Sequence, residues 1–229
     1  MPEARCTAVY GGKKIELGPG TTLRVVRWNH RGDSIQNAEQ HNPVELSSGP
    51  RIDAISGGLR LGVAEAFPNG GGNRAYLSTV DRPRGRFSWF VQDSVSPVDL
   101  PVAIILDGKD YGAPLENLKA AMRDAGIDRI DLWIGTGGTA VARPLVRALR
   151  PKASMPAHRD DFFAPFERSV TTPYSSPELG AFLAAARVKL ITPQQLMDRW
   201  GLEADGIARE PDDAVQDTLG FAGPAREAR

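Results

Sequence analysis

Residues 130–156 decide the fold class, and they read IDLWIGTGGTAVARPLVRALRPKASMP. The apolar run Ile130 to Ile134 predicts a buried strand, and Gly135 to Gly138 separates it from a helical pattern over Thr139 to Leu149. A second short strand is predicted at Ala153 to Pro156. Strand, helix and strand in this order are typical of a βαβ unit, so the sequence predicts a sheet with helices packed on it.

The alternation of strand and helix continues on both sides of this stretch. Upstream, Val102 to Leu106 predicts a buried strand and Ala113 to Ala125 predicts a helix with an apolar stripe. Downstream, Pro177 to Ala186 and Pro193 to Trp200 predict helices that flank a strand at Val188 to Ile191. The fold class expected for the chain is therefore α/β, with a mixed sheet and helices.

The first third of the chain predicts strands joined by glycine-rich turns, followed by a long irregular segment from residue 29 to residue 73. We expect a domain over residues 1–200, and over residues 201–229 a C-terminal helix, at Asp212 to Leu219, with a tail. The β-branched and aromatic runs that predict the strands are Cys6 to Tyr10, Lys13 to Leu17, Thr22 to Trp28, Arg74 to Val80 and Arg86 to Val91.

Charge and composition exclude several classes of partner. The 229 residues carry 28 Lys and Arg against 28 Asp and Glu, so there is no net positive charge to attract nucleic acid or an anionic membrane. No apolar run approaches the roughly 20 residues that cross a bilayer, and no signal peptide is visible at Met1. The single cysteine, Cys6, is consistent with a reducing compartment, and the chain is expected to be cytoplasmic. With nucleic acid and membranes excluded as partners, the expected substrate is a small molecule.

Two of the three histidines follow predicted strands directly. His30 comes after Thr22 to Trp28 and His158 after Ala153 to Pro156, while Asp93 comes after Arg86 to Val91. Two imidazoles and a carboxylate form a ligand set that zinc or a similar divalent metal accepts. The alternative is that these are hydrogen-bonded loop residues. The third histidine, in the irregular segment, has no strand beside it and is interpreted as a non-ligand.

Two other motifs have a structural and a functional interpretation. The stretch Gly135 to Gly138 precedes a helix and would present backbone N–H groups to a nucleotide phosphate, but it lacks the spacing of known phosphate loops and is interpreted as a tight connection. The aromatic residues Phe87, Trp89 and Phe90 are interpreted as core, with a contact surface as the alternative.

Three segments resemble the C-terminal half of metallo-beta-lactamase fold hydrolases: Leu132 to Gly138, the turn Arg150-Pro151-Lys152, and Met155 to Phe162. The resemblance covers roughly residues 5 to 200. It implies a partial αββα sandwich and a metal-bound hydroxide that attacks an ester, amide or phosphate bond.

The resemblance also implies roles for individual residues. His30 would bind a first metal, Asp93 would bridge or bind a second, and His158 would complete the second site. Asp33 or Asp160 would accept a hydrogen bond from an imidazole and fix its tautomer. The implied cofactor is zinc or another divalent metal.

The sequence departs from this family at its main signature, His-x-His-x-Asp-His, because no histidine precedes His30. We therefore expect a truncated hydrolase of impaired activity. Its sheet would have an exposed apolar face, which a second copy of the chain would cover in a homo-oligomer. The alternative is a non-catalytic binding or assembly module that retains the fold and uses residues 68–73 as a contact surface.

Overall fold

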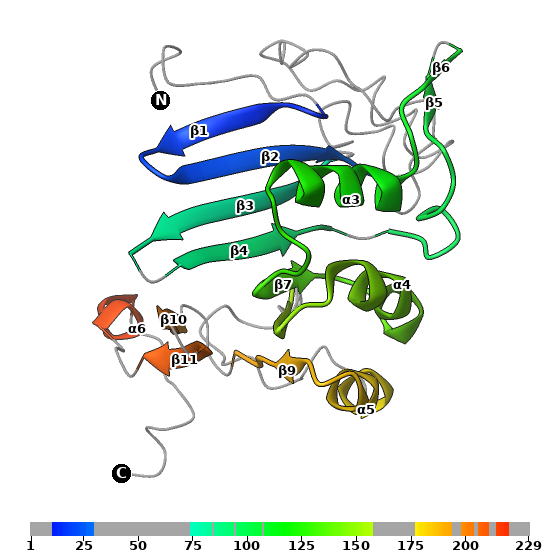
Figure 1. Ribbon diagram of the computed structural model, residues 1–229. Helices are drawn as coiled ribbons and strands as arrows, with labels where there is room; N and C mark the ends of the chain where they lie inside the picture. Colours follow the sequence, from blue (N-terminus) through cyan, green and yellow to red (C-terminus); the bar gives the residue numbers. More distant parts are fainter. Residues whose placement is uncertain are drawn as a thin grey trace, which may run out of the picture.

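Seven strands form one mixed sheet in the order β1-β2-β3-β4-β7-β8-β9 (Figure 1). The computed structural model describes residues 11–29, 74–83, 85–93, 95–106, 108–157, 177–193, 198–203, 206–210 and 214–219. The strands of the sheet are β1 (Lys14–Gly18), β2 (Thr21–Arg27), β3 (Arg74–Arg82), β4 (Gly85–Val91), β7 (Leu132–Gly135), β8 (Ala153–Pro156) and β9 (Lys189–Leu190).

The direction of the strands divides the sheet into two parts. Strands β1 to β4 pair antiparallel with their neighbours, in the order in which they follow along the chain. Strands β4, β7, β8 and β9 pair parallel, and helices connect the last three of them. The predicted α/β class with a mixed sheet is confirmed.

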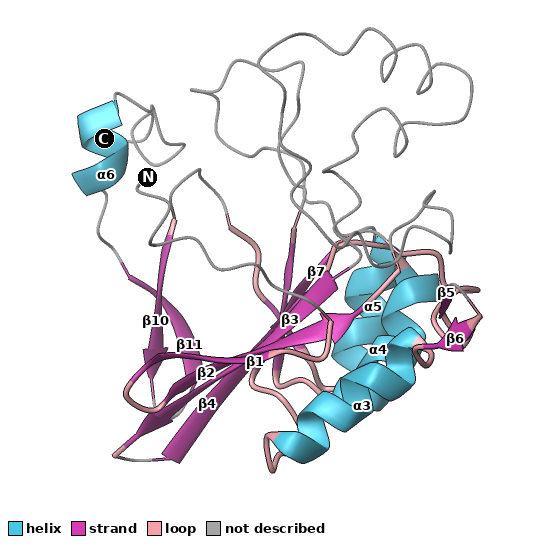
Figure 2. Cartoon of the chain, turned by 90° about the horizontal axis from the view of Figure 1, so that it is seen from above, coloured by secondary structure: helices cyan, strands magenta, loops and turns pink. Residues whose placement is uncertain are grey.

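Three helices cover one face of the sheet: α3 (Pro114–Asp124), α4 (Thr139–Leu149) and α5 (Pro177–Ala185) (Figure 2). Proline at the first position of α3 has no N–H to leave unpaired, which suits a helix start. Apolar side chains three or four positions apart, such as Leu118 and Met122, turn towards the sheet and are buried there. The main core therefore lies between the sheet and these helices.

The opposite face of the sheet carries a second, smaller core. A two-stranded hairpin of β10 (Arg199–Glu203) and β11 (Gly206–Glu210) packs there, and its Ile207 is buried against Phe87 and Ala153 of the sheet. The aromatic residues on β4 thus point into the two cores in alternation. The core interpretation is confirmed for Phe87 and Phe90, which are 8% and 0% exposed.

Two predicted elements are wrong. In place of a buried strand at Val102 to Leu106, the chain forms β5 (Ile105–Leu106), which pairs only with β6 (Lys109–Asp110) in a small separate hairpin. Ile105 is 45% exposed, because β5 lies outside the main sheet. Residues 194–197 of the helix predicted at Pro193 to Trp200 lie outside the described residues, and its last two residues, Arg199 and Trp200, begin β10 instead.

The other predicted elements agree with the structure to within a few residues, including the last helix, α6 (Ala214–Leu219). The strand predicted at Cys6 to Tyr10 lies outside the described residues.

An ion pair joins β2 to the end of α3. Arg24 is 7% exposed, and its Nε donates to Asp124 Oδ2 over 2.7 Å. Its other nitrogens donate to the Asp124 carbonyl and to Thr79 Oγ1, each over 3.3 Å. The hydrogen bond from Arg24 outweighs desolvation and lowers the pKa of Asp124 from its ordinary value of 3.8.

This pair predicts a pH-dependent contribution to stability. Because the folded-state pKa of Asp124 lies below its unfolded value, the contribution is fully present above pH 3.8 and is lost as the pH falls through the folded pKa. The variant Asp124→Asn should be less stable than the parent in urea unfolding at pH 7, and the difference should shrink at pH 3. A difference that is the same at both pH values would contradict this account.

Candidate functional site at the carboxyl edge of the sheet

The carboxyl ends of β2, β4, β7 and β8 lie at one edge of the sheet. Strands β4, β7 and β8 are parallel, and β2 has the same direction because two antiparallel pairings separate it from β4. In sheets with parallel strands and covering helices, ligands bind in the crevice outside this edge. A functional site is therefore expected among the segments that leave this edge.

Gln92 holds two of these segments together directly after β4. Its side chain is 2% exposed, and its backbone N–H donates to the Ile134 carbonyl over 3.0 Å. Its Nε2 donates to the Thr136 carbonyl over 2.9 Å. The next residue, Asp93, is exposed and lies beside this fixed point. Gln92 thus ties the segment after β4 to the segment after β7, directly beside Asp93.

The glycine-rich connection after β7 is shaped by close packing. A Cβ on Gly135 would lie 2.4 Å from both Gln92 Nε2 and Trp133 Nε1, so no side chain fits there. Gly137 has φ of +109°, and a Cβ on it would lie 2.8 Å from the Val141 side chain. Packing accounts for both glycines, which favours the tight connection over a nucleotide loop.

Of the predicted site residues, the structure describes only Asp93. His30 and His158, and also Asp33, Asp160 and His41, lie outside the described residues. Among the residues that are described, no group of three or more His, Cys, Asp and Glu side chains is close enough to hold a metal. The described chain reaches Asn29 on the β2 side and Ala157 on the β8 side, one residue short of each histidine.

Buried polar atoms gather at the same edge. Within the described part of the chain, five buried side-chain atoms in this region make no hydrogen bond, and they belong to the two residues after β2, the residue after β4, the second residue of β7 and the first residue of α4. Leaving such an atom unpaired in a folded protein costs about 1–3 kcal/mol, so each of these atoms calls for a hydrogen-bond partner. The five atoms are Trp28 Nε1, Asn29 Oδ1, Gln92 Oε1, Trp133 Nε1 and Thr139 Oγ1.

These five side chains are absent from the set that the sequence predicts. The signal for two of them was present, because Asn29 and Gln92 are polar residues directly after apolar strands, in the same position as His30 and Asp93. The two tryptophans gave no such signal, since an indole in an apolar strand pattern is interpreted as core.

None of the helices within the described ranges has the length and apolar character that a bilayer crossing requires.

The packing around Gly135 predicts a large effect of one added methyl group. The variant Gly135→Ala should lose about 1–3 kcal/mol of unfolding free energy, because the Cβ displaces the buried side chains of Gln92 and Trp133. The matched control is Gly180→Ala in α5, where no atom lies within 4 Å of the added Cβ. The control should gain up to about 1 kcal/mol from helix propensity. Equal effects in urea unfolding would contradict the packing account.

Comparison with known proteins leaves the site without an external assignment. No protein-family model, curated protein or solved structure matches this chain.

Proposed function

We propose that the chain is a metal-dependent hydrolase related in fold to the metallo-beta-lactamase hydrolases, with one divalent metal, zinc or a similar ion, at the carboxyl edge of the sheet. Its ligands in this proposal are His30, Asp93 and His158. The observation that supports it is the shared direction of β2, β4 and β8, because the three residues follow the ends of these strands within three positions in the sequence.

Chain lengths are compatible with a shared site. Neighbouring strands lie about 4.8 Å apart, so the end of β4 is about 10 Å from the ends of β2 and β8, with one strand between in each case. Two or three extended residues span about 7–10 Å. Segments that leave β2 and β8 towards β4 are therefore long enough to bring both imidazoles to Asp93, at the middle of the edge.

The donor set fits a single catalytic metal. Two imidazoles and one carboxylate leave a coordination position for water, as in catalytic zinc sites with three protein ligands. A metal held by these residues would lower the pKa of a water molecule towards neutrality and would polarise the oxygen of the bond to be cleaved. Asp93 contributes the negative charge of the site, and Gln92 fixes the backbone from which it projects. Asp33 and Asp160 would orient the imidazoles by accepting their second N–H.

The hydrolase activity in this proposal is impaired, because part of the ligand set of the family is missing from the sequence. The family that the chain resembles has a His-x-His-x-Asp-His segment, and this chain has no histidine before His30. Three ligands support one metal and do not support the two-metal site that the full ligand set builds. The partial αββα sandwich of the proposal consists of the seven-stranded sheet and its three helices. The hairpin of β10 and β11 packs on its second face, and another copy of the chain would pack beside that hairpin.

Metal binding tests the ligand assignment. Chelated protein titrated with Zn²⁺ should bind about one equivalent, and His30→Ala, Asp93→Asn and His158→Ala should each weaken binding by about tenfold or more. His41→Ala is the matched control and should bind zinc as the parent does, because it removes an imidazole outside the proposed set. Calorimetric titration and metal analysis after desalting give the affinity and the stoichiometry.

The possible results separate the candidate functions. Loss of zinc binding in the three variants but not in His41→Ala supports the hydrolase, and slow turnover of an ester or phosphodiester is expected with it. Absence of stoichiometric binding in the parent favours the non-catalytic binding module. Two equivalents of zinc with rapid turnover would contradict the impaired single-metal site.

A further inference from the structure

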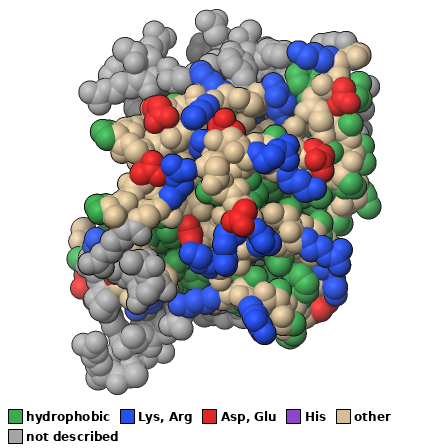
Figure 3. Space-filling model, in the orientation of Figure 1, with side chains coloured by type: hydrophobic (Ala, Val, Ile, Leu, Met, Phe, Trp, Pro, Cys, Tyr) green, Lys and Arg blue, Asp and Glu red, His purple; other side chains and the backbone are tan. Residues whose placement is uncertain are grey.

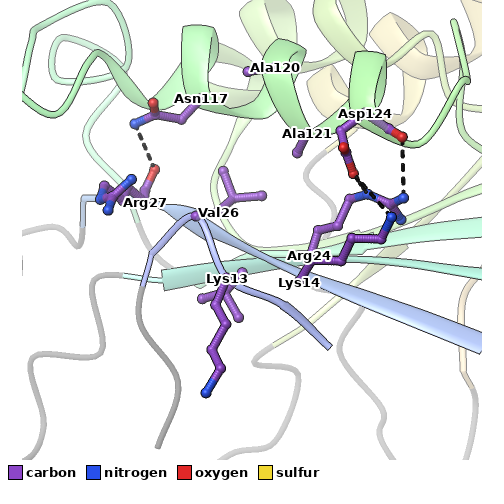
Figure 4. Close-up of a pocket in the computed structure, with 11 residues that line it drawn as sticks. Lys13, Lys14, Arg24, Val26, Arg27, Asn117, Ala120, Ala121 and Asp124 are labelled. Atoms are coloured by element: carbon purple, nitrogen blue, oxygen red, sulfur yellow. Dashed lines mark hydrogen bonds and ion pairs between the residues drawn. The ribbon is translucent and has the colours of Figure 1, made fainter. Parts of the chain in front are cut away.

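A pocket lies between α3 and the strands β1 and β2, on the face of the sheet that carries the helices (Figure 4). Its volume is about 290 Å³, which is room for a small organic molecule. The apolar part of its wall comes from Val26, Ala120 and Ala121. The walls of the pocket are one side of α3 and the sheet face, and the pocket reaches Arg27, the last residue of β2.

Positive charge predominates among the described residues that line this pocket. Four lining residues, Lys13, Lys14, Arg24 and Arg27, are basic and one, Asp124, is acidic, and in Figure 4 the side chain of Lys13 points away from α3. Elsewhere on the face that Figure 3 shows, basic and acidic side chains are intermixed. The chain as a whole has a formal net charge of zero.

The single carboxylate of the pocket, that of Asp124, already interacts with two cations. Asp124 accepts the hydrogen bond from Arg24 Nε at 2.7 Å, and Arg24 is the cation that burial would otherwise leave uncompensated. Lys14 Nζ lies 3.8 Å from the same carboxylate oxygen and is 51% exposed. In Figure 4 both cations point to Asp124 from neighbouring strands, where Lys14 and Arg24 are register partners. One negative charge thus faces two positive charges at this end of the pocket.

The other end of the pocket is formed by Arg27. Its guanidinium lies 4.9 Å from the centre of the Tyr111 ring, and its carbonyl accepts a hydrogen bond from Asn117 Nδ2 of α3 over 3.4 Å. Gly12 lets the guanidinium approach the backbone, since a Cβ there would lie 2.8 Å from Arg27 Nη1. The basic group is thus held in place by an aromatic face and by a residue without a side chain.

We propose that this pocket binds a small organic anion with two or more negative charges, with its charged groups at Lys14 and Arg27 and its apolar part between them, against Val26 and the alanines of α3. Ammonium and guanidinium groups at the two ends match the oxygens of a phosphate ester or of a polycarboxylate. Both classes share this chemistry, and the probes below distinguish them. This binding is independent of the proposed hydrolase activity.

Titration calorimetry with phenyl phosphate and, separately, with citrate tests the proposal. One of the two probes should bind at one site per chain, and its affinity should fall as sodium chloride is added. The variants Lys14→Gln and Arg27→Gln should each raise the dissociation constant about tenfold, because each removes a charge-assisted hydrogen bond. Arg123→Gln is the matched control, since this exposed cation next to Asp124 on α3 does not line the pocket.

The same experiment has outcomes that overturn the proposal. Absence of binding by both probes at low salt does so, and so does an equal weakening in Arg123→Gln, which would show attraction by general charge alone. Melting temperatures of the variants establish that they are folded. Binding by phenyl phosphate alone assigns the phosphate class, and binding by citrate alone assigns the polycarboxylate class. A failed zinc titration leaves this result unaffected.

Discussion

The parallel pairing of β4 with β7 is the constraint on which the rest of the structure depends. It joins the antiparallel part of the sheet to the strands that alternate with helices, through the pairs Trp89–Leu132, Phe90–Trp133 and Val91–Ile134. Asp131 secures the junction, because its carboxylate accepts hydrogen bonds from the backbone N–H and the hydroxyl of Ser88. This one pairing sets the common direction of the strands, and with it the edge at which their carboxyl ends meet.

The sequence predicted most of the fold because the elements concerned have strong local patterns. The strand at Leu132–Gly135 and the helix at Thr139–Leu149 bury apolar residues at the spacing that each structure requires. The two wrong elements have patterns that only tertiary structure resolves. In the stretch Val102 to Leu106, Ile104 is buried, but Val102 and Ile105 are exposed and β5 lies in a side hairpin. Trp200 belongs to a strand that packs on the second face of the sheet.

The candidate sites divide in the same way. The position of Asp93 after a strand is visible in the sequence, as are those of the two histidines assigned with it. The cationic pocket is invisible there, because Arg24 and Asp124 are 100 positions apart and meet only when α3 lies across β2. The burial of Trp133 Nε1 could not be predicted from the sequence either, because Gln92, which lies near it, follows a different strand, β4.

The ladder between β2 and β3 has a consequence for how the chain tolerates change. These neighbouring strands form seven consecutive pairs, from Thr21–Val80 to Arg27–Arg74, although residues 28–73 separate them along the chain. The entropy of closing a loop grows slowly with its length, by about 0.6 kcal/mol for each doubling. Beyond the buried Trp28 and Asn29 and the proposed ligand His30, a change of a few residues in the length of this connection therefore alters its closure entropy by much less than about 0.6 kcal/mol. The length of the connection and the pairing of the two strands at its ends are thus nearly independent in energy.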